Sequence, residues 1–187
     1  MKVYVLDLRK YKCNNNLPIE FLKQVNKYKN EKSQVSLVAW SFLEEILRKE
    51  YLIDTSNLVI ELNEKGKPKF KNSDIYFNIS HSHDLIAIGI GKEELGIDIE
   101  CCIDRTNFEQ LIRRIDKEIT IFTKEMFYDL WTKKEARYKR DNNCNFFNIT
   151  MKEVKNILTF TILDSENNEY KLSIDTSETI VNMDEYL

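Results

Sequence analysis

The sequence lacks several features that mark particular classes of protein. It contains only 4 glycines and 2 prolines among 187 residues, so no segment resembles a long flexible linker. No apolar run approaches the roughly 20 residues that a membrane-spanning helix needs. Basic residues do not exceed acidic ones, with 28 Lys and Arg against 31 Asp and Glu, which argues against a general nucleic-acid-binding protein. We therefore expect neither a membrane segment nor a nucleic-acid partner.

The cysteines are few and unpaired in spacing. Neither CxxC nor any other metal-ligand spacing occurs among Cys13, Cys101, Cys102 and Cys144. This pattern favours free thiols in a reducing compartment over disulfides or a zinc site. The first 11 residues alternate apolar and polar side chains without a hydrophobic core segment, which is typical of a strand and not of a signal peptide. The sequence thus predicts a cytoplasmic protein.

Apolar periodicity divides the chain into helical and extended segments. We expect strands at residues 1–11, 58–62, 67–70, 77–90, 95–100, 147–151, 157–163 and 170–174. We expect helices at residues 18–25, 33–49, 108–115 and 123–140. In the long helix, Trp40 and Glu44 are predicted on the side away from the core. Because the order strand, helices, strands occurs twice, the sequence predicts an α+β protein of two similar halves, residues 1–94 and 95–187.

The stretch from residue 77 to residue 100, FNISHSHDLIAIGIGKEELGIDIE, organises the chain. At its end, Asp98 and Glu100 alternate with Ile97 and Ile99. Successive side chains of a strand point to opposite faces, so the two carboxylates are expected on one face and the isoleucines on the other. Acidic side chains that protect an edge strand are the alternative. The neighbouring apolar runs favour an internal strand and a metal site instead.

A helical segment of the second half supplies a further carboxylate. Residues four apart share a helix face, so Trp131, Glu135 and Lys139 form one row. An exposed ion pair between Glu135 and Lys139 is the simple interpretation of this row. Together with Asp98 and Glu100, however, Glu135 completes three oxygen ligands. Such ligands favour magnesium, with manganese as an alternative, and a magnesium site normally also binds a substrate phosphate.

Basic and polar side chains are available for such a phosphate. The candidate lysines on the same rim are Lys67, Lys134 and Lys139. His81 and His83 are predicted in a serine-rich turn between strands, where a hydrogen-bonded structural role is the default. Ser80 and His81 could equally donate to a phosphate. A Ser-His nucleophile is disfavoured, because no Gly-x-Ser-x-Gly elbow is present.

Three segments together resemble a known family. FNISHS (77–82), GIDIE (96–100) and WTKKEARYK (131–139) follow Gly66-Lys67-Pro68 in the order typical of the Sfp-type 4′-phosphopantetheinyl transferases. The resemblance implies transfer of the phosphopantetheine arm of coenzyme A to a serine of an acyl or peptidyl carrier protein, with release of 3′,5′-ADP. It also implies a monomeric pseudodimer of two α+β halves, with the active site in the cleft between them.

The resemblance further implies residue roles. Asp98, Glu100 and Glu135 match the family's magnesium ligands, and Glu135 and Lys139 are the expected catalytic residues. The residues expected to hold coenzyme A are Lys67, Ser80, His81 and Lys134. The family's arginine at the start of the long helix has no counterpart in Lys32-Ser33-Gln34-Val35, so the candidates to replace it are Lys29 and Lys32.

Two other functions fit parts of the pattern. The first is a non-catalytic member of the same fold that binds coenzyme A or a carrier protein. The second is a metal-dependent nuclease, because acidic residues and a lysine near a sheet also cleave phosphodiesters. The acidic pI of about 5.6 and the absence of a basic stripe disfavour the nuclease.

Overall fold

The computed structural model describes residues 1–14, 16–27, 31–115, 123–141, 143–179 and 182–187. Its strands are β1 (Lys2–Asp7), β2 (Ile60–Leu62), β3 (Pro68–Phe70), β4 (Tyr76–Ser82), β5 (Leu85–Gly91), β6 (Gly96–Cys101), β7 (Leu158–Leu163), β8 (Glu169–Asp175) and β9 (Asn182–Tyr186). Its α-helices are α1 (Ile19–Val25), α2 (Glu31–Lys49), α3 (Phe108–Ile115), α4 (Lys124–Arg140) and α5 (Met151–Val154). Short 3₁₀ helices cover Thr55–Asn57 and Phe146–Asn148. No described helix is long and apolar enough to cross a bilayer.

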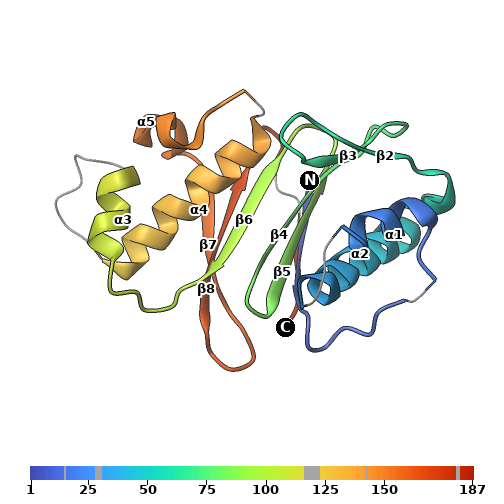
Figure 1. Ribbon diagram of the computed structural model, residues 1–187, viewed down its shortest axis with the longest axis horizontal. Coiled ribbons are helices and arrows are strands. Elements are labelled where there is room, and N and C mark those ends of the chain that lie inside the picture. Colours follow the sequence, from blue (N-terminus) through green and yellow to red (C-terminus); the bar gives the residue numbers. More distant parts are fainter. Residues whose placement is uncertain (15, 28–30, 116–122, 142, 180–181) are drawn as a thin grey trace.

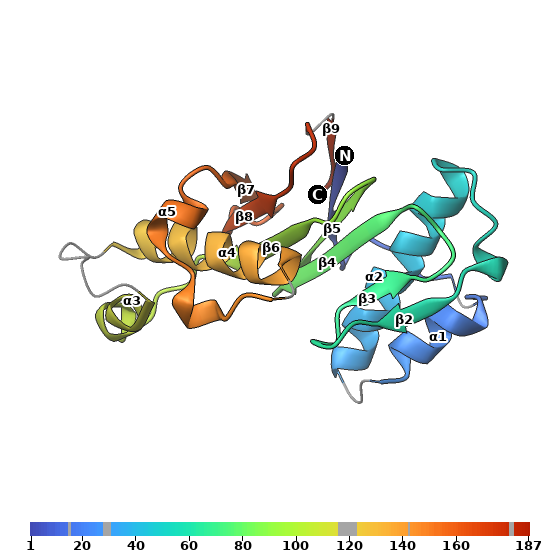
Figure 2. The same cartoon turned by 90° about the horizontal axis from the view of Figure 1, so that it is seen from above.

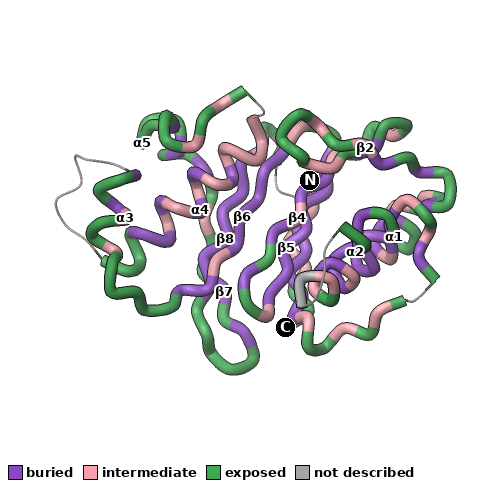
Figure 3. The backbone as a smooth tube through the Cα atoms, in the orientation of Figure 1, coloured by how far each residue is buried: buried purple, intermediate pink, exposed green. Residues whose placement is uncertain are grey.

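The strands form two larger sheets and one small hairpin. The first sheet has the order β4-β5-β1-β9, the second has the order β6-β8-β7, and β2 pairs with β3. All pairings are antiparallel except that of β1 with β9, which is parallel. Helices α1 and α2 lie beside the first sheet, whereas α3, α4 and α5 lie beside the second (Figures 1 and 2). The strands at the centre of the molecule are almost continuously buried (Figure 3).

Alternate residues of the strands supply different hydrophobic cores. On β1, Tyr4 and Leu6 face the core beneath α1 and α2, whereas Val3 and Val5 face the core between the two sheets. A third core surrounds α3, α4 and α5. Strand β5 contributes to the first two cores and is buried along its whole length. The apolar run that predicted this strand is therefore explained by burial on both faces.

The mixed α+β composition and most predicted elements are confirmed. One prediction about α2 is wrong, because Trp40 and Glu44 are only 6% and 4% exposed. Trp40 packs edge-on against Phe21 and Phe77. Glu44 accepts a hydrogen bond from Thr55 at 2.8 Å. The long helix is thus buried over a wider arc than its apolar stripe predicted, because α1 and residues 55–77 cover it from further sides.

The C-terminal third differs most from the sequence prediction. The expected strand at residues 147–151 is wrong, since a 3₁₀ helix and the start of α5 occupy this segment. Strand β9 was not predicted. It pairs with β1, so the end of the chain returns to the sheet of the first half. A boundary at residue 94 therefore separates the strands of the two larger sheets except for β9.

Candidate active site

Strand β6 presents acidic side chains on one face and apolar side chains on the other. Ile97 and Ile99 are fully buried in the core between the two sheets. Asp98 lies on the opposite face, where it is 4% exposed and contacts Lys139 of α4. Glu100 follows on the same face and is half-buried. The predicted alternation along β6 is confirmed, and it directs both carboxylates toward α4.

A glycine allows α4 to approach this face of β6 closely. A Cβ atom at Gly96 would lie 1.9 Å from the carbonyl oxygen of Ala136, inside the 3.0 Å that Cβ contacts essentially always respect. Ala136 itself is fully buried. Because Glu135 and Lys139 flank Ala136 on the same helix, the close contact brings their side chains to Asp98.

The centre of the site is an ion pair. The ammonium group of Lys139 lies 2.6 Å from Oδ1 of Asp98. The hydroxyl of Ser80 donates to the same oxygen at 2.9 Å and accepts a hydrogen bond from Lys139 at 3.0 Å. Oδ2 of Asp98 is buried and has no hydrogen-bond partner among the described residues. Lys139 thus forms its ion pair with Asp98, and no close pair with Glu135 is found in the described part of the chain.

The other two carboxylates carry perturbed pKa values. Burial raises the pKa of Glu135 above its ordinary value of 4.5, and the charge of Asp98 raises it further. The pKa of Glu100 is raised by the same two causes in the same order. The negative charge of Asp98 therefore acts on both glutamates, and that of Glu100 also acts on Glu135. The three predicted carboxylates are electrostatic neighbours in the fold.

Strand β4 borders the site, and the sequence predicted only part of its role there. Contrary to our expectation of an internal strand, β6 lies at the edge of its sheet, but its outer edge is hydrogen-bonded by side chains of β4. The backbone N–H groups of Ile97, Ile99 and Cys101 donate to side-chain oxygens of Asn78 at 2.8 Å, Ser80 at 3.3 Å and Ser82 at 3.1 Å. We call these three β4 side chains the polar seam. Its signal was the period-two spacing of Asn, Ser and Ser in FNISHS.

A pocket of about 230 Å³ opens beside Lys139. Its lining comprises residues 65–68, Asn78, Ile79, Tyr138 and Lys139. The turn before β3 depends on Gly66, whose φ of 82° favours glycine. Lys67 donates to the carboxylate of Glu94 at 2.9 Å and to the carbonyl of Leu95 at 2.8 Å. The Gly66-Lys67-Pro68 motif and the lysine of α4 therefore meet at one pocket, although they are far apart in sequence.

Other predicted site residues lie elsewhere. The prediction that Lys134 shares the rim of this site is not supported by its position, since it is 1% exposed and donates to the carbonyl of Ile115 at 2.9 Å. His81 is an exposed residue of β4, so its predicted place in a turn is wrong; the turn holds His83, with a φ of 48°. Lys29 and the side chain of Lys32 lie outside the described residues.

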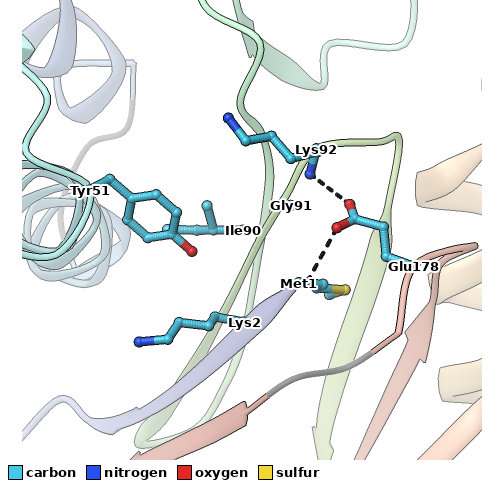
Figure 4. A pocket seen from close by; sticks show the side chains of 7 residues that line it. All are labelled: Met1, Lys2, Tyr51, Ile90, Gly91, Lys92 and Glu178. Carbon is cyan, nitrogen blue, oxygen red and sulfur yellow. Dashed lines mark hydrogen bonds and ion pairs between the residues drawn. The ribbon is translucent and has the colours of Figure 1, made fainter.

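A second pocket does not share these residues. It lies near the start of β1 and the end of β5 and is lined by Met1, Lys2, Tyr51, Ile90, Gly91, Lys92 and Glu178 (Figure 4). The carboxylate of Glu178 accepts hydrogen bonds from the backbone N–H groups of Lys92 at 2.6 Å and Glu93 at 2.8 Å. It also pairs with the amino group of Met1 at 3.2 Å. These bonds occupy the carboxylate of Glu178, so its role in this pocket is structural.

The residues of the site fit a divalent cation without forming a closed cage for it. Within the described ranges, no three His, Cys, Asp or Glu side chains are arranged so as to hold a metal ion. Magnesium is usually bound by one or two carboxylates, several waters and the phosphates of a substrate. The unpartnered Oδ2 of Asp98 offers such a ligand. A cation would also offset the repulsion that raises the pKa values of Glu100 and Glu135.

The arrangement of the site indicates which kind of ligand it suits. In this α+β chain a buried carboxylate contacts Lys139 and is electrostatically coupled to two glutamates, and Lys139 also lines the pocket that contains Lys65 and Lys67. Carboxylates suited to a hard cation beside lysines suit the binding of a phosphorylated ligand.

Comparisons with known proteins agree with this interpretation. The chain is 31% identical over 147 residues to the 4′-phosphopantetheinyl transferase gsp of Aneurinibacillus migulanus, a match that covers 72% of this chain and 61% of the relative. It is 26% identical over 126 residues to 4′-phosphopantetheinyl transferase Sfp of Bacillus subtilis, covering 61% and 54%. It is 34% identical over 93 residues to 4′-phosphopantetheinyl transferase AcpT of Escherichia coli O157:H7, covering 41% and 45%. No family model matches the sequence.

The resemblance predicted from the motifs is thus confirmed, and the chain is a relative of the 4′-phosphopantetheinyl transferases. The matches span only about half to three-fifths of the length of these relatives.

Proposed function

We propose that this protein transfers the 4′-phosphopantetheine moiety of coenzyme A to a serine of an apo carrier protein and releases 3′,5′-ADP. The observation that carries the proposal is the contact of Lys139 with Asp98 beside the pocket formed by residues 65–68. Together with the hydrogen bonds of Ser80 to Asp98 and Lys139, this contact joins the three motifs of the resemblance beside the Gly66-Lys67-Pro68 step.

The proposed site lies where two halves of the chain meet. We propose that residues 1–94 and 95–187 are two similar α+β halves of a monomer, with coenzyme A bound in a cleft between them. The pocket supports this proposal, because its lining comes from the hairpin β2–β3, from β4 and from α4. The free thiols of all four cysteines support a reducing compartment such as the cytoplasm.

Each polar side chain has a role in the proposed reaction. Lys67 and His81 would hold the 3′-phosphate and adenosine end of coenzyme A. Lys139 would offset negative charge as it develops on the departing 3′,5′-ADP. Ser80 donates its one hydroxyl hydrogen to Asp98, so a contact of Ser80 with a phosphate would have to replace that bond. Lys134 would likewise have to leave the carbonyl of Ile115.

Glu135 is the proposed general base. A serine hydroxyl is a weak nucleophile, and a carboxylate that accepts its proton makes it a stronger one. In the metal-free protein burial and the charge of Asp98 raise the pKa of Glu135, and a bound cation would offset the second of these causes. Asp98, Glu100 and Glu135 would hold Mg²⁺, which would neutralise the pyrophosphate oxygens of coenzyme A.

Mass spectrometry of a carrier protein tests the proposal. Apo carrier protein incubated with coenzyme A, Mg²⁺ and this protein should gain the mass of the phosphopantetheine arm. The variant Glu135→Ala removes the proposed base and should lower the rate by at least about 10²–10⁴-fold, the range of general acid–base catalysis. The variant Asp98→Ala removes a proposed cation ligand and the partner of Lys139, and should abolish transfer. No mass gain with any of a panel of acyl and peptidyl carrier proteins would contradict the proposal.

A lysine of the same helix provides a matched control. Lys133 pairs with Asp129 at 2.7 Å on another face of α4, so Lys133→Ala should transfer at the wild-type rate while Lys139→Ala should not. Calorimetric titration with coenzyme A separates an enzyme from a binding protein. Coenzyme A binding without transfer would favour the non-catalytic interpretation of the same site.

A further inference from the structure

Ser82 is a buried polar residue that the proposed reaction does not use. It is 8% exposed and lies at the end of β4, in the polar seam. Its hydroxyl oxygen accepts the backbone N–H of Cys101 at 3.1 Å. Its hydroxyl hydrogen is directed to Oε2 of Glu100 at 2.9 Å, which is nearer than Nδ1 of His83 at 3.4 Å.

The two serines of the polar seam make equivalent contacts with the two acidic residues of β6. Ser80 accepts the N–H of Ile99 and donates to Asp98, and Ser82 accepts the N–H of Cys101 and donates to Glu100. An ionised carboxylate can only accept, so the single hydroxyl hydrogen of each serine points to the carboxylate, while a lone pair of the same oxygen accepts the backbone N–H. The spacing of two residues on both strands produces this repeated arrangement.

Asn78 differs from the two serines in one respect. Its side-chain oxygen accepts the N–H of Ile97 at 2.8 Å, but no described contact joins it to a carboxylate. The third member of the polar seam therefore binds the backbone of β6 alone. Asn78 therefore joins the two strands without orienting an acidic side chain, whereas Ser80 and Ser82 do both.

Orientation of a carboxylate determines which of its oxygens is available to a cation. The hydrogen bond from Ser82 occupies Oε2 of Glu100, while no described hydrogen bond reaches Oε1. A hydrogen-bonded carboxylate loses less conformational entropy when it binds a cation, because its rotamer is already fixed. Without the hydroxyl, the side chain of Glu100 would rotate more freely beside the negative charge of Asp98.

We infer that Ser82 is a positioning residue that fixes Glu100 for a divalent cation, through the hydrogen bond from its hydroxyl to Oε2. The inference rests on the proposed function, because it assumes that Glu100 is a cation ligand. It assigns the second serine of FNISHS a role in the metal site, where the first serine holds Asp98 and Lys139.

Binding of Mn²⁺ to the full chain, measured by electron paramagnetic resonance without substrate, tests this role. Ser82→Ala should weaken Mn²⁺ binding about tenfold, as is typical when a residue that orients a ligand is removed. Ser82→Thr keeps the hydroxyl and should bind Mn²⁺ within about threefold of wild type. Asn78→Ala removes a seam contact without touching a carboxylate, so its Mn²⁺ affinity should equal that of wild type. Urea unfolding in EDTA verifies that each variant is folded.

A double-mutant cycle with Glu100→Gln identifies the path of the effect. If Ser82 acts through Glu100, Ser82→Ala should cause no further loss of Mn²⁺ affinity in the Glu100→Gln protein. An equal tenfold loss in both backgrounds, or an equal loss in Asn78→Ala, would overturn the role of Ser82 and leave the proposed function intact. Absence of Mn²⁺ binding by the wild-type protein would overturn the metal site itself.

Discussion

Replacement of Gly96 by alanine tests the packing that assembles the site. The added Cβ would lie 1.9 Å from the carbonyl oxygen of Ala136 and 2.7 Å from the backbone nitrogen of Arg140. To restore even a 3.0 Å separation from the oxygen, α4 and β6 must move apart by about 1.1 Å. The obstacle is backbone, so no side-chain rotation relieves it.

The consequence for the site follows from the 2.6 Å contact between Lys139 and Asp98. A displacement of about 1.1 Å along this direction would stretch it beyond the length of a hydrogen bond. Forced overpacking of this kind costs about 1–3 kcal/mol of stability. A misplacement of about 1 Å between catalytic groups costs about 10²-fold in rate. We therefore expect Gly96→Ala to lose activity far beyond its loss of stability.

Urea unfolding and carrier-protein modification measure the two effects separately. Gly91→Ala is the matched control, because its Cβ would meet a side-chain oxygen of Glu178 and not backbone (Figure 4). Displacement of Glu178 would disturb its hydrogen bonds with the N–H groups of Lys92 and Glu93, which lie outside the proposed site. The control should therefore unfold at a lower urea concentration than wild type but transfer at nearly the wild-type rate. If Gly96→Ala behaves like Gly91→Ala in both assays, the close approach of α4 to β6 does not assemble the site.

Two further predictions concern pH. Glu135→Gln should stabilise the metal-free protein at neutral pH. Burial and the charge of Asp98 raise the pKa of Glu135 above 4.5, so the folded state keeps this proton to higher pH than the unfolded state does. The stability of the wild type therefore falls as pH rises from about 4.5 through the raised pKa. Urea unfolding in EDTA from pH 4 to pH 8 measures this, and parallel curves for variant and wild type would refute it. Asp7→Asn should destabilise the protein at neutral pH, because the hydrogen bond from the Arg9 side chain is the largest cause that lowers the pKa of the buried Asp7; ionised Asp7 therefore contributes stability above its unfolded value of about 3.8 that is lost as pH falls through the lowered folded value. The difference between Asp7→Asn and wild type should shrink toward pH 3, and a difference independent of pH would contradict the assignment.

Local patterns were sufficient for the elements that build the site. The alternation of Asp98 and Glu100 with two isoleucines predicted the faces of β6, because a strand has a fixed period of two. The four-residue spacing of Glu135 and Lys139 likewise predicted a shared face of α4. Patterns failed where burial came from several directions, as at Trp40, and where short turns of helix replaced a strand after residue 146.

The sequence by itself determined which chemical groups face the same way on each element, since backbone geometry sets these periods locally. It did not determine which elements meet. Only the tertiary structure placed Lys139 on Asp98, directed Lys134 into the protein and aligned the polar seam with β6. These contacts join residues 19 to 41 positions apart, and they depend on the backbone contact at Gly96 and on the cores on either side. Such packing is a property of the whole fold, and no local period records it.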